Sequence, residues 1–173
     1  MTGDAAWYEA AMVVGITNAL NVVADGLTEA RALGAGLPDP DEARAPAGAA
    51  AVFAEIRAFY ARTDVPVAFG LLATDPGYLA DVWGATQRAF SDNRLTRRLK
   101  EALAFAVSLT TRSGFGTAFH LGEMRRLGVG DRGVMEVLGV TQMFSSYTKI
   151  ADTLQLEPDM GDIAPVDGSP APG

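Results

Sequence analysis

Apolar residues recur at intervals of three or four along most of the chain, which is the spacing of one face of a helix. The first such pattern covers residues 4–33, where Asp4 fits the N-cap position. The apolar residues that share this face are Met12, Ile16, Leu20, Val23 and Leu27. No long alternation of apolar and polar residues and no hairpin signal interrupts the helical patterns. The pattern therefore predicts an all-α protein.

Glycine and proline residues separate the further helices of the chain. We expect these helices at residues 49–62, from Pro66 to the residue before Pro76, at 77–90, 95–112 and 117–127, and at 132–138 continuing to 154 with a kink near Gly139. Several amphipathic helices joined by short connections are typical of a compact helical bundle.

Two segments have the composition of connecting or unstructured chain. Residues 34–48, GAGLPDPDEARAPAG, indicate a linker, and the proline-rich residues 157–173 indicate an extended or disordered tail. The predicted organisation is an N-terminal helix at 1–33, the linker at 34–48, a helical core at 49–156 and a flexible tail at 157–173.

Residues 13–27 and 140–154 resemble each other. They read VVGITNALNVVADGL and VTQMFSSYTKIADTL, and they share Val, Ala, Asp and Leu at matching places when shifted by 127 residues. One interpretation is that two amphipathic helices of similar composition look alike. The other is a duplication, in which two related helices pack around a pseudo-symmetric core.

The charge and composition of the chain exclude several classes of function. The chain of 173 residues carries 21 acidic and 14 basic residues, for a net charge of −7, which disfavours binding to nucleic acid or to an anionic membrane surface. It has no cysteine and one histidine, so we expect no disulfide, no redox pair, no metal site and no cofactor. We also expect no signal peptide and no membrane span, and hence a cytoplasmic protein.

Glu101 and His120 are the candidate catalytic residues. Glu101 opens the run EALAFAVSL, which is apolar on all sides and therefore indicates a buried helix. Burial favours the protonated form of a carboxyl group, which suits general acid–base catalysis. The alternative is an ordinary helix glutamate paired with Arg97 or Arg98. His120 lies between Phe119 and Leu121 and is either a proton-transfer group or a core histidine.

Ser113, Phe115 and Thr117 lie at the corner before the helix at 117–127 and are candidate binding residues. One interpretation is that the hydroxyl groups of Ser113 and Thr117 cap this helix. The other is a small anion or oxyanion site at the helix N-terminus.

The stretch from Lys100 to Leu154 resembles the core motif of the alkylhydroperoxidase AhpD and carboxymuconolactone decarboxylase superfamily. Members show a glutamate opening an apolar helix, a Cys-x-x-Cys turn, a histidine four residues later, and then a Leu-Gly turn with an acidic cap. Glu101 and His120 match the glutamate and the histidine, and Leu127, Gly128 and Asp131 match the later turn. The 19-residue spacing of the glutamate and the histidine also fits the family, so we expect the two side chains within direct or one-water reach of each other, facing a cavity. The resemblance implies an AhpD-like helical fold and homo-oligomers, since the family commonly forms trimers and hexamers.

The two cysteine positions of that motif hold Ser113 and Gly116 here. The peroxide-reducing branch of the family uses the cysteine pair, with the glutamate and histidine as a proton relay. Serine and glycine cannot cycle between thiol and disulfide, so cysteine-dependent peroxidase activity is excluded. The decarboxylase branch lacks the pair and works by acid–base chemistry, a role that would suit Glu101 and His120.

Two functions therefore stay open. The first is a cofactor-free acid–base enzyme, a lyase or isomerase that decarboxylates, opens or isomerises a small organic molecule. The second is a non-catalytic pseudoenzyme that is kept for assembly, for binding a partner or for binding a hydrophobic ligand. In both cases we expect a homo-oligomer, because an apolar first helix with its own linker often packs on a neighbouring subunit.

Overall fold

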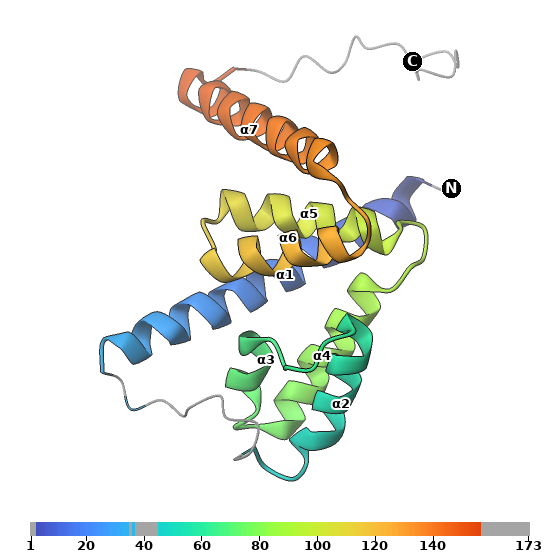
Figure 1. The fold of residues 1–173 in the computed structure, drawn as a ribbon. Coiled ribbons are helices and arrows are strands. Elements are labelled where there is room, and N and C mark those ends of the chain that lie inside the picture. The colour runs from blue at the N-terminus through green and yellow to red at the C-terminus, as the bar shows by residue number, and fades with distance from the viewer. Residues whose placement is uncertain (1–2, 35, 37–44, 157–173) are drawn as a thin grey trace. The chain divides into compact units, whose positions relative to one another are not determined.

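The computed structural model describes residues 3–34, 36 and 45–156, and this part of the chain contains helices and no strand (Figure 1). The helices are α1 (Gly3–Ala32), α2 (Ala49–Tyr60), α3 (Val67–Leu72), α4 (Pro76–Phe90), α5 (Arg97–Thr110), α6 (Gly114–Arg126) and α7 (Asp131–Leu154). The predicted all-α class is confirmed. The predicted tail at 157–173 and residues 37–44 of the predicted linker lie outside the described residues.

The chain divides after Thr141 into two compact units, residues 1–141 and 142–173, and the boundary falls within α7. The predicted organisation into first helix, linker, core and tail stays a prediction. The helix α7 runs from Asp131 to Leu154 without interruption, including at Gly139, where a kink was expected.

Side-chain caps explain why two helices begin where they do. Thr96 accepts a hydrogen bond from the Leu99 N–H, so α5 begins at Arg97 rather than at Leu95. Ser113 accepts one from the Gly116 N–H, so α6 takes in Gly114 and begins three residues before the predicted start at Thr117. The helix ends just before Gly128, whose positive φ of 83° suits a glycine at the end of a helix.

The helix α1 packs along α3, α4, α5 and α6 within the first unit. Its buried face differs from the predicted one, because Met12 is 47% exposed. The residues of α1 that are buried are Val13, Thr17, Leu20, Asn21 and Ala24. Two polar residues, Thr17 and Asn21, therefore belong to the buried face. A prediction from apolar residues alone leaves them out and places the buried face part of a turn away from where it lies.

The helices α1 and α5 lie side by side and run in the same direction, while α6 runs back along both (Figure 1). Near the start of the pair, Glu9 Oε2 lies 3.2 Å from Lys100 Nζ. Further along, Asn21 Nδ2 donates to Ser108 Oγ over 3.0 Å. At the corner that leads into α6, the Phe115 N–H donates to Asp25 Oδ1 over 3.1 Å. These contacts fix the register of α1 against the α5–α6 pair.

By length and composition alone, residues 5–32 of α1 are apolar enough to cross a membrane. A core helix of a folded protein passes the same test, and α1 buries one face against four other helices. A cytoplasmic location stays a prediction.

In the second unit, the described chain is the last part of α7 and the residues after it, up to Leu156. Its large apolar side chains are exposed: Met143, Phe144, Tyr147, Ile150, Leu154 and Leu156.

Candidate functional site

Glu101 and His120 are in direct contact between α5 and α6. His120 Nδ1 lies 2.8 Å from Glu101 Oε2. Glu101 is 0% and His120 is 3% exposed. The tight corner after Thr110 sends α6 back along α5, so residues separated by 19 positions in sequence meet. The predicted proximity of these two side chains is confirmed. The cavity that they were predicted to face stays a prediction.

Glu101 also has an arginine partner, as the alternative interpretation of this residue expected. Arg97 Nε lies 3.4 Å from Glu101 Oε1. The same guanidinium donates to Glu123 Oε2 over 3.1 Å and to the Phe59 carbonyl over 2.9 Å. Arg126 NH2 approaches Glu123 Oε2 at 2.6 Å. The two buried carboxylates thus meet two guanidinium groups, and Glu101 also contacts the His120 imidazole.

Two aromatic rings pack against the His120 imidazole. Phe90 stacks on it at 5.7 Å between centroids with an interplanar angle of 9°, and Phe119 meets it edge-on at 5.2 Å. Tyr60 is buried beside the same cluster. Burial raises the pKa of the Tyr60 hydroxyl well above its usual range, and the charge of Glu101 acts in the same direction. Tyr60 therefore stays neutral.

The corner at the start of α6 uses its free N–H groups internally. Ser113 Oγ accepts from the Gly116 N–H over 2.8 Å, and the Asp25 carboxylate accepts from the Phe115 N–H over 3.1 Å. The Thr117 N–H bonds to the Ser113 carbonyl. Ser113 is thus the cap that one interpretation predicted. A ligand-binding role for Ser113, Phe115 and Thr117 stays a prediction.

Gly116 has no room for a side chain. A Cβ atom at this position would overlap Asn21 Oδ1 and Ser108 Oγ, which lie against the glycine from α1 and α5. The Asn21 carboxamide therefore fills the space beside the second position at which the resemblance expects a cysteine. Asn21 and Ser108 were not predicted as site residues from the sequence. Asn21 is a polar residue next to the predicted apolar stripe of α1, and Ser108 interrupts the apolar run of α5, so both carried a weak signal.

A comparison with family models assigns the part of the chain that holds this cluster. Residues 76–156 match the model of the carboxymuconolactone decarboxylase family. This part of the chain is similar to that family. The matched residues take in α4 to α7, and hence Glu101, His120 and the Ser113–Gly116 corner. No curated protein and no solved structure matches the chain.

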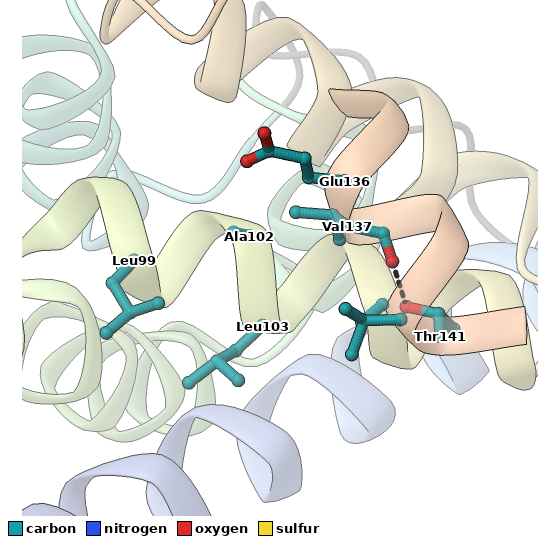
Figure 2. A pocket seen from close by; sticks show the side chains of 8 residues that line it. Leu99, Ala102, Leu103, Glu136, Val137 and Thr141 are labelled. Carbon is teal, nitrogen blue, oxygen red and sulfur yellow. Dashed lines mark hydrogen bonds between the residues drawn. The ribbon is translucent and has the colours of Figure 1, made fainter. Parts of the chain in front are cut away.

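An apolar pocket lies on another side of α5, within the part of the chain that matches this family (Figure 2). It has a volume of about 260 Å³ and lies between α5 and the first part of α7. Its lining residues are Leu99, Ala102, Leu103, Ala106, Glu136, Val137, Val140 and Thr141. Glu136 pairs with Arg132, and the Thr141 hydroxyl bonds to the Val137 carbonyl. The pocket offers apolar contact and does not include Glu101 or His120.

Metal-ligating side chains do not gather in the domain. Among the described residues there is no group of three or more His, Asp or Glu side chains that could hold a metal ion.

Proposed function

We propose that this protein is an acid–base enzyme that needs no cofactor and acts on a small organic substrate. The observation that carries the proposal is the 2.8 Å contact between His120 Nδ1 and Glu101 Oε2 inside a cluster whose other charges are paired. When Nδ1 donates its hydrogen to Glu101, the lone pair of the imidazole lies on Nε2, which can take a proton from a substrate. The Glu101 carboxylate stabilises the imidazolium that results.

Such a pair would serve decarboxylation, lactone opening or isomerisation, because each of these reactions needs a proton to be moved and a negative charge to be accommodated. The family name supplies one substrate to try, a carboxymuconolactone. Thiol-dependent peroxide reduction is excluded for this chain, since it contains no cysteine.

A second candidate function is supported by the burial of the same pair. Glu101 is fully buried and His120 nearly so, and Arg97 already neutralises Glu101. A charge cluster of this kind also suits a non-catalytic protein, in which the cluster fixes the packing of α5 against α6. Such a protein would bind a partner or a hydrophobic ligand, for which the apolar pocket beside α5 is available.

The variant Glu101→Gln separates the two candidates. In the catalytic case we expect the fold to persist, because Arg97 keeps its bonds to Glu123 and to the Phe59 carbonyl, and we expect turnover of carboxymuconolactone to fall about 100-fold or more. The matched control is Glu123→Gln, which neutralises the other buried carboxylate of the cluster without touching His120. This control should lower the melting temperature and keep turnover.

The opposite pattern overturns the catalytic proposal. It would consist of wild-type protein without turnover, together with a Glu101→Gln variant that loses as much thermal stability as Glu123→Gln. The ring-nitrogen NMR spectrum gives an independent readout, because His120 is the only histidine of the chain. We expect the tautomer with hydrogen on Nδ1 in the wild type, and a mixture of tautomers in Glu101→Gln.

A further inference from the structure

Two buried oxygen atoms on α1 have no hydrogen-bond partner in the described part of the chain: Thr17 Oγ1 and Asn21 Oδ1. Thr17 is 0% and Asn21 is 3% exposed. Buried polar atoms are bonded in the great majority of cases, and an exception calls for an explanation such as a bound water or ligand. Two exceptions on one helix, four residues apart, lie on the same face and close enough for one small group to meet both.

The hydroxyl of Thr17 behaves differently from those of other threonines within helices. Four of these donate to the carbonyl four residues earlier on their own helix: Thr86, Thr141, Thr148 and Thr153. Thr17 makes no such bond. Its hydroxyl is therefore available to a group outside α1.

The register of α1 places Thr17 level with His120. One turn before Thr17, Val13 packs in the same cluster as Phe90, and Phe90 stacks on the His120 ring. One turn after Thr17, Asn21 lies against Gly116, which precedes His120 by one turn of α6. The turns of α1 before and after Thr17 therefore both pack near His120, and Thr17 lies between these two turns.

The bonds of Asn21 define the kind of group that can bind. Ser108 Oγ donates to the Ala104 carbonyl over 2.8 Å, so it accepts from Asn21, and the atom facing it must be Nδ2. The free atom of the carboxamide is then Oδ1, which only accepts hydrogen bonds. A carboxylate or a carbonyl oxygen has no hydrogen to offer this atom, whereas a hydroxyl group or a water molecule does.

We propose that Thr17 and Asn21 form a binding site for an O–H group beside His120, occupied by water in the free protein and by a hydroxyl group of a substrate during turnover. Thr17 Oγ1 and Asn21 Oδ1 hold the oxygen and orient its hydrogen. The catalytic meaning of the site, in which His120 exchanges a proton with the bound O–H group, rests on the proposed function. The hydroxyl site itself is independent of that function.

The test uses the variant Thr17→Val, which removes the hydroxyl group and keeps the shape of the side chain. In the wild type we expect magnetisation transfer from a long-lived water to the Thr17 methyl group and to the His120 ring, and we expect it to be lost in Thr17→Val. Thr17→Ser keeps the hydroxyl group and loses the methyl group, so it should retain the transfer to the His120 ring. The matched control is Thr86→Val, also at a fully buried threonine, whose hydroxyl is already bonded to the Val82 carbonyl; this change should leave the transfer and the His120 ring-nitrogen resonances unchanged.

The proposal is overturned if no long-lived water is detected in the wild type, or if Thr17→Val leaves the His120 resonances where Thr86→Val leaves them. It is also overturned if Thr17→Val raises the melting temperature, because removing an idle buried hydroxyl group stabilises a protein. Methanol serves as the probe for a substrate hydroxyl. Contacts between the methanol methyl group and Thr17, with loss of the water signal, support a site that a substrate can enter.

These measurements need no turnover. If no substrate is ever found, the hydroxyl site can still be present. If turnover is found and Thr17→Val leaves both turnover and the bound water intact, only this inference fails.

Discussion

Residues 13–27 of α1 and 140–154 of α7 carry apolar side chains at matching positions and lie in opposite surroundings. Val13 is 0% and Leu20 is 7% exposed, whereas their counterparts Val140 and Tyr147 are 58% and 59% exposed. In α1 the stripe is covered by α3 to α6. The spacing of apolar residues therefore specifies a helix with one apolar face. It does not specify which part of the protein, or of a partner, covers that face.

The exposed stripe on α7 also has the spacing of a coiled-coil seam. Its members alternate at intervals of three and four residues: Val140, Met143, Tyr147, Ile150 and Leu154. The charged residues of this segment are Lys149 and Asp152, which lie off the seam and cancel each other. In a chain with a net charge of −7, this is a surface on which two copies can meet without like-charge repulsion. We propose that a second copy of the chain covers it.

The largest effect that we expect is on assembly. Tyr147→Glu places a negative charge in the seam of each copy, so like charges meet at the interface and the association constant should fall at least about tenfold. Gln142→Glu adds the same charge to the same helix away from the seam and should leave assembly intact. Light scattering at micromolar concentration measures both. A wild-type monomer under those conditions contradicts the predicted homo-oligomer.

The next effect concerns how closely α6 packs against the buried face of α1. Gly116→Ala drives a methyl group into Asn21 and Ser108 and should lower the free energy of unfolding by about 3 kcal/mol, the upper end of the cost of overpacking. Gly122→Ala, on the same helix with open space around it, should raise the free energy of unfolding by up to about 1 kcal/mol through helix propensity. Denaturant titrations compare the two. Equal behaviour of both variants would mean that α1 does not lie against Gly116.

The same substitution at the matching positions Val13 and Val140 tests whether their surroundings differ. Val13→Ala opens a cavity in the core and should cost about 2 kcal/mol of unfolding free energy. Val140→Ala should change that free energy by less than about 0.5 kcal/mol, as is usual for an exposed position. Both are measured at low protein concentration, where assembly contributes least. A cost for Val140→Ala that grows with concentration would show that an assembled partner covers this position.

The smallest effect is a dependence of stability on pH at the start of α1. The backbone N–H of Leu95 lowers the pKa of Glu9 below 4.5, and the N–H of Arg94 and the side chain of Lys100 act in the same direction. Glu9 therefore contributes stability that is complete above its ordinary pKa and is lost as the pH falls through the lowered pKa. Glu9→Gln should lower the melting temperature more at pH 7 than at pH 3, as thermal scans can measure. An equal loss at both pH values would contradict this linkage.

Much of the fold follows from local patterns in the sequence. The caps and the glycine and proline positions located the helices to within a few residues, and the apolar run after Glu101 indicated a helix with no exposed side. The Glu101–His120 contact was expected from the family spacing. What escaped prediction is the buried polar side of α1, since Asn21 is buried where α5 and α6 present Ser108 and Gly116 to it, and Thr17 lies one turn earlier on the same buried face. Local patterns carry no information about such partners.

The close fit of Asn21 against Gly116 also limits the order in which this lineage could acquire mutations. A cysteine at position 113 would replace a serine of similar size and lose mainly the helix cap. A cysteine at position 116 would collide with the Asn21 carboxamide unless position 21 had already become smaller. A gain of dithiol chemistry at this corner therefore depends on a prior substitution on a different helix.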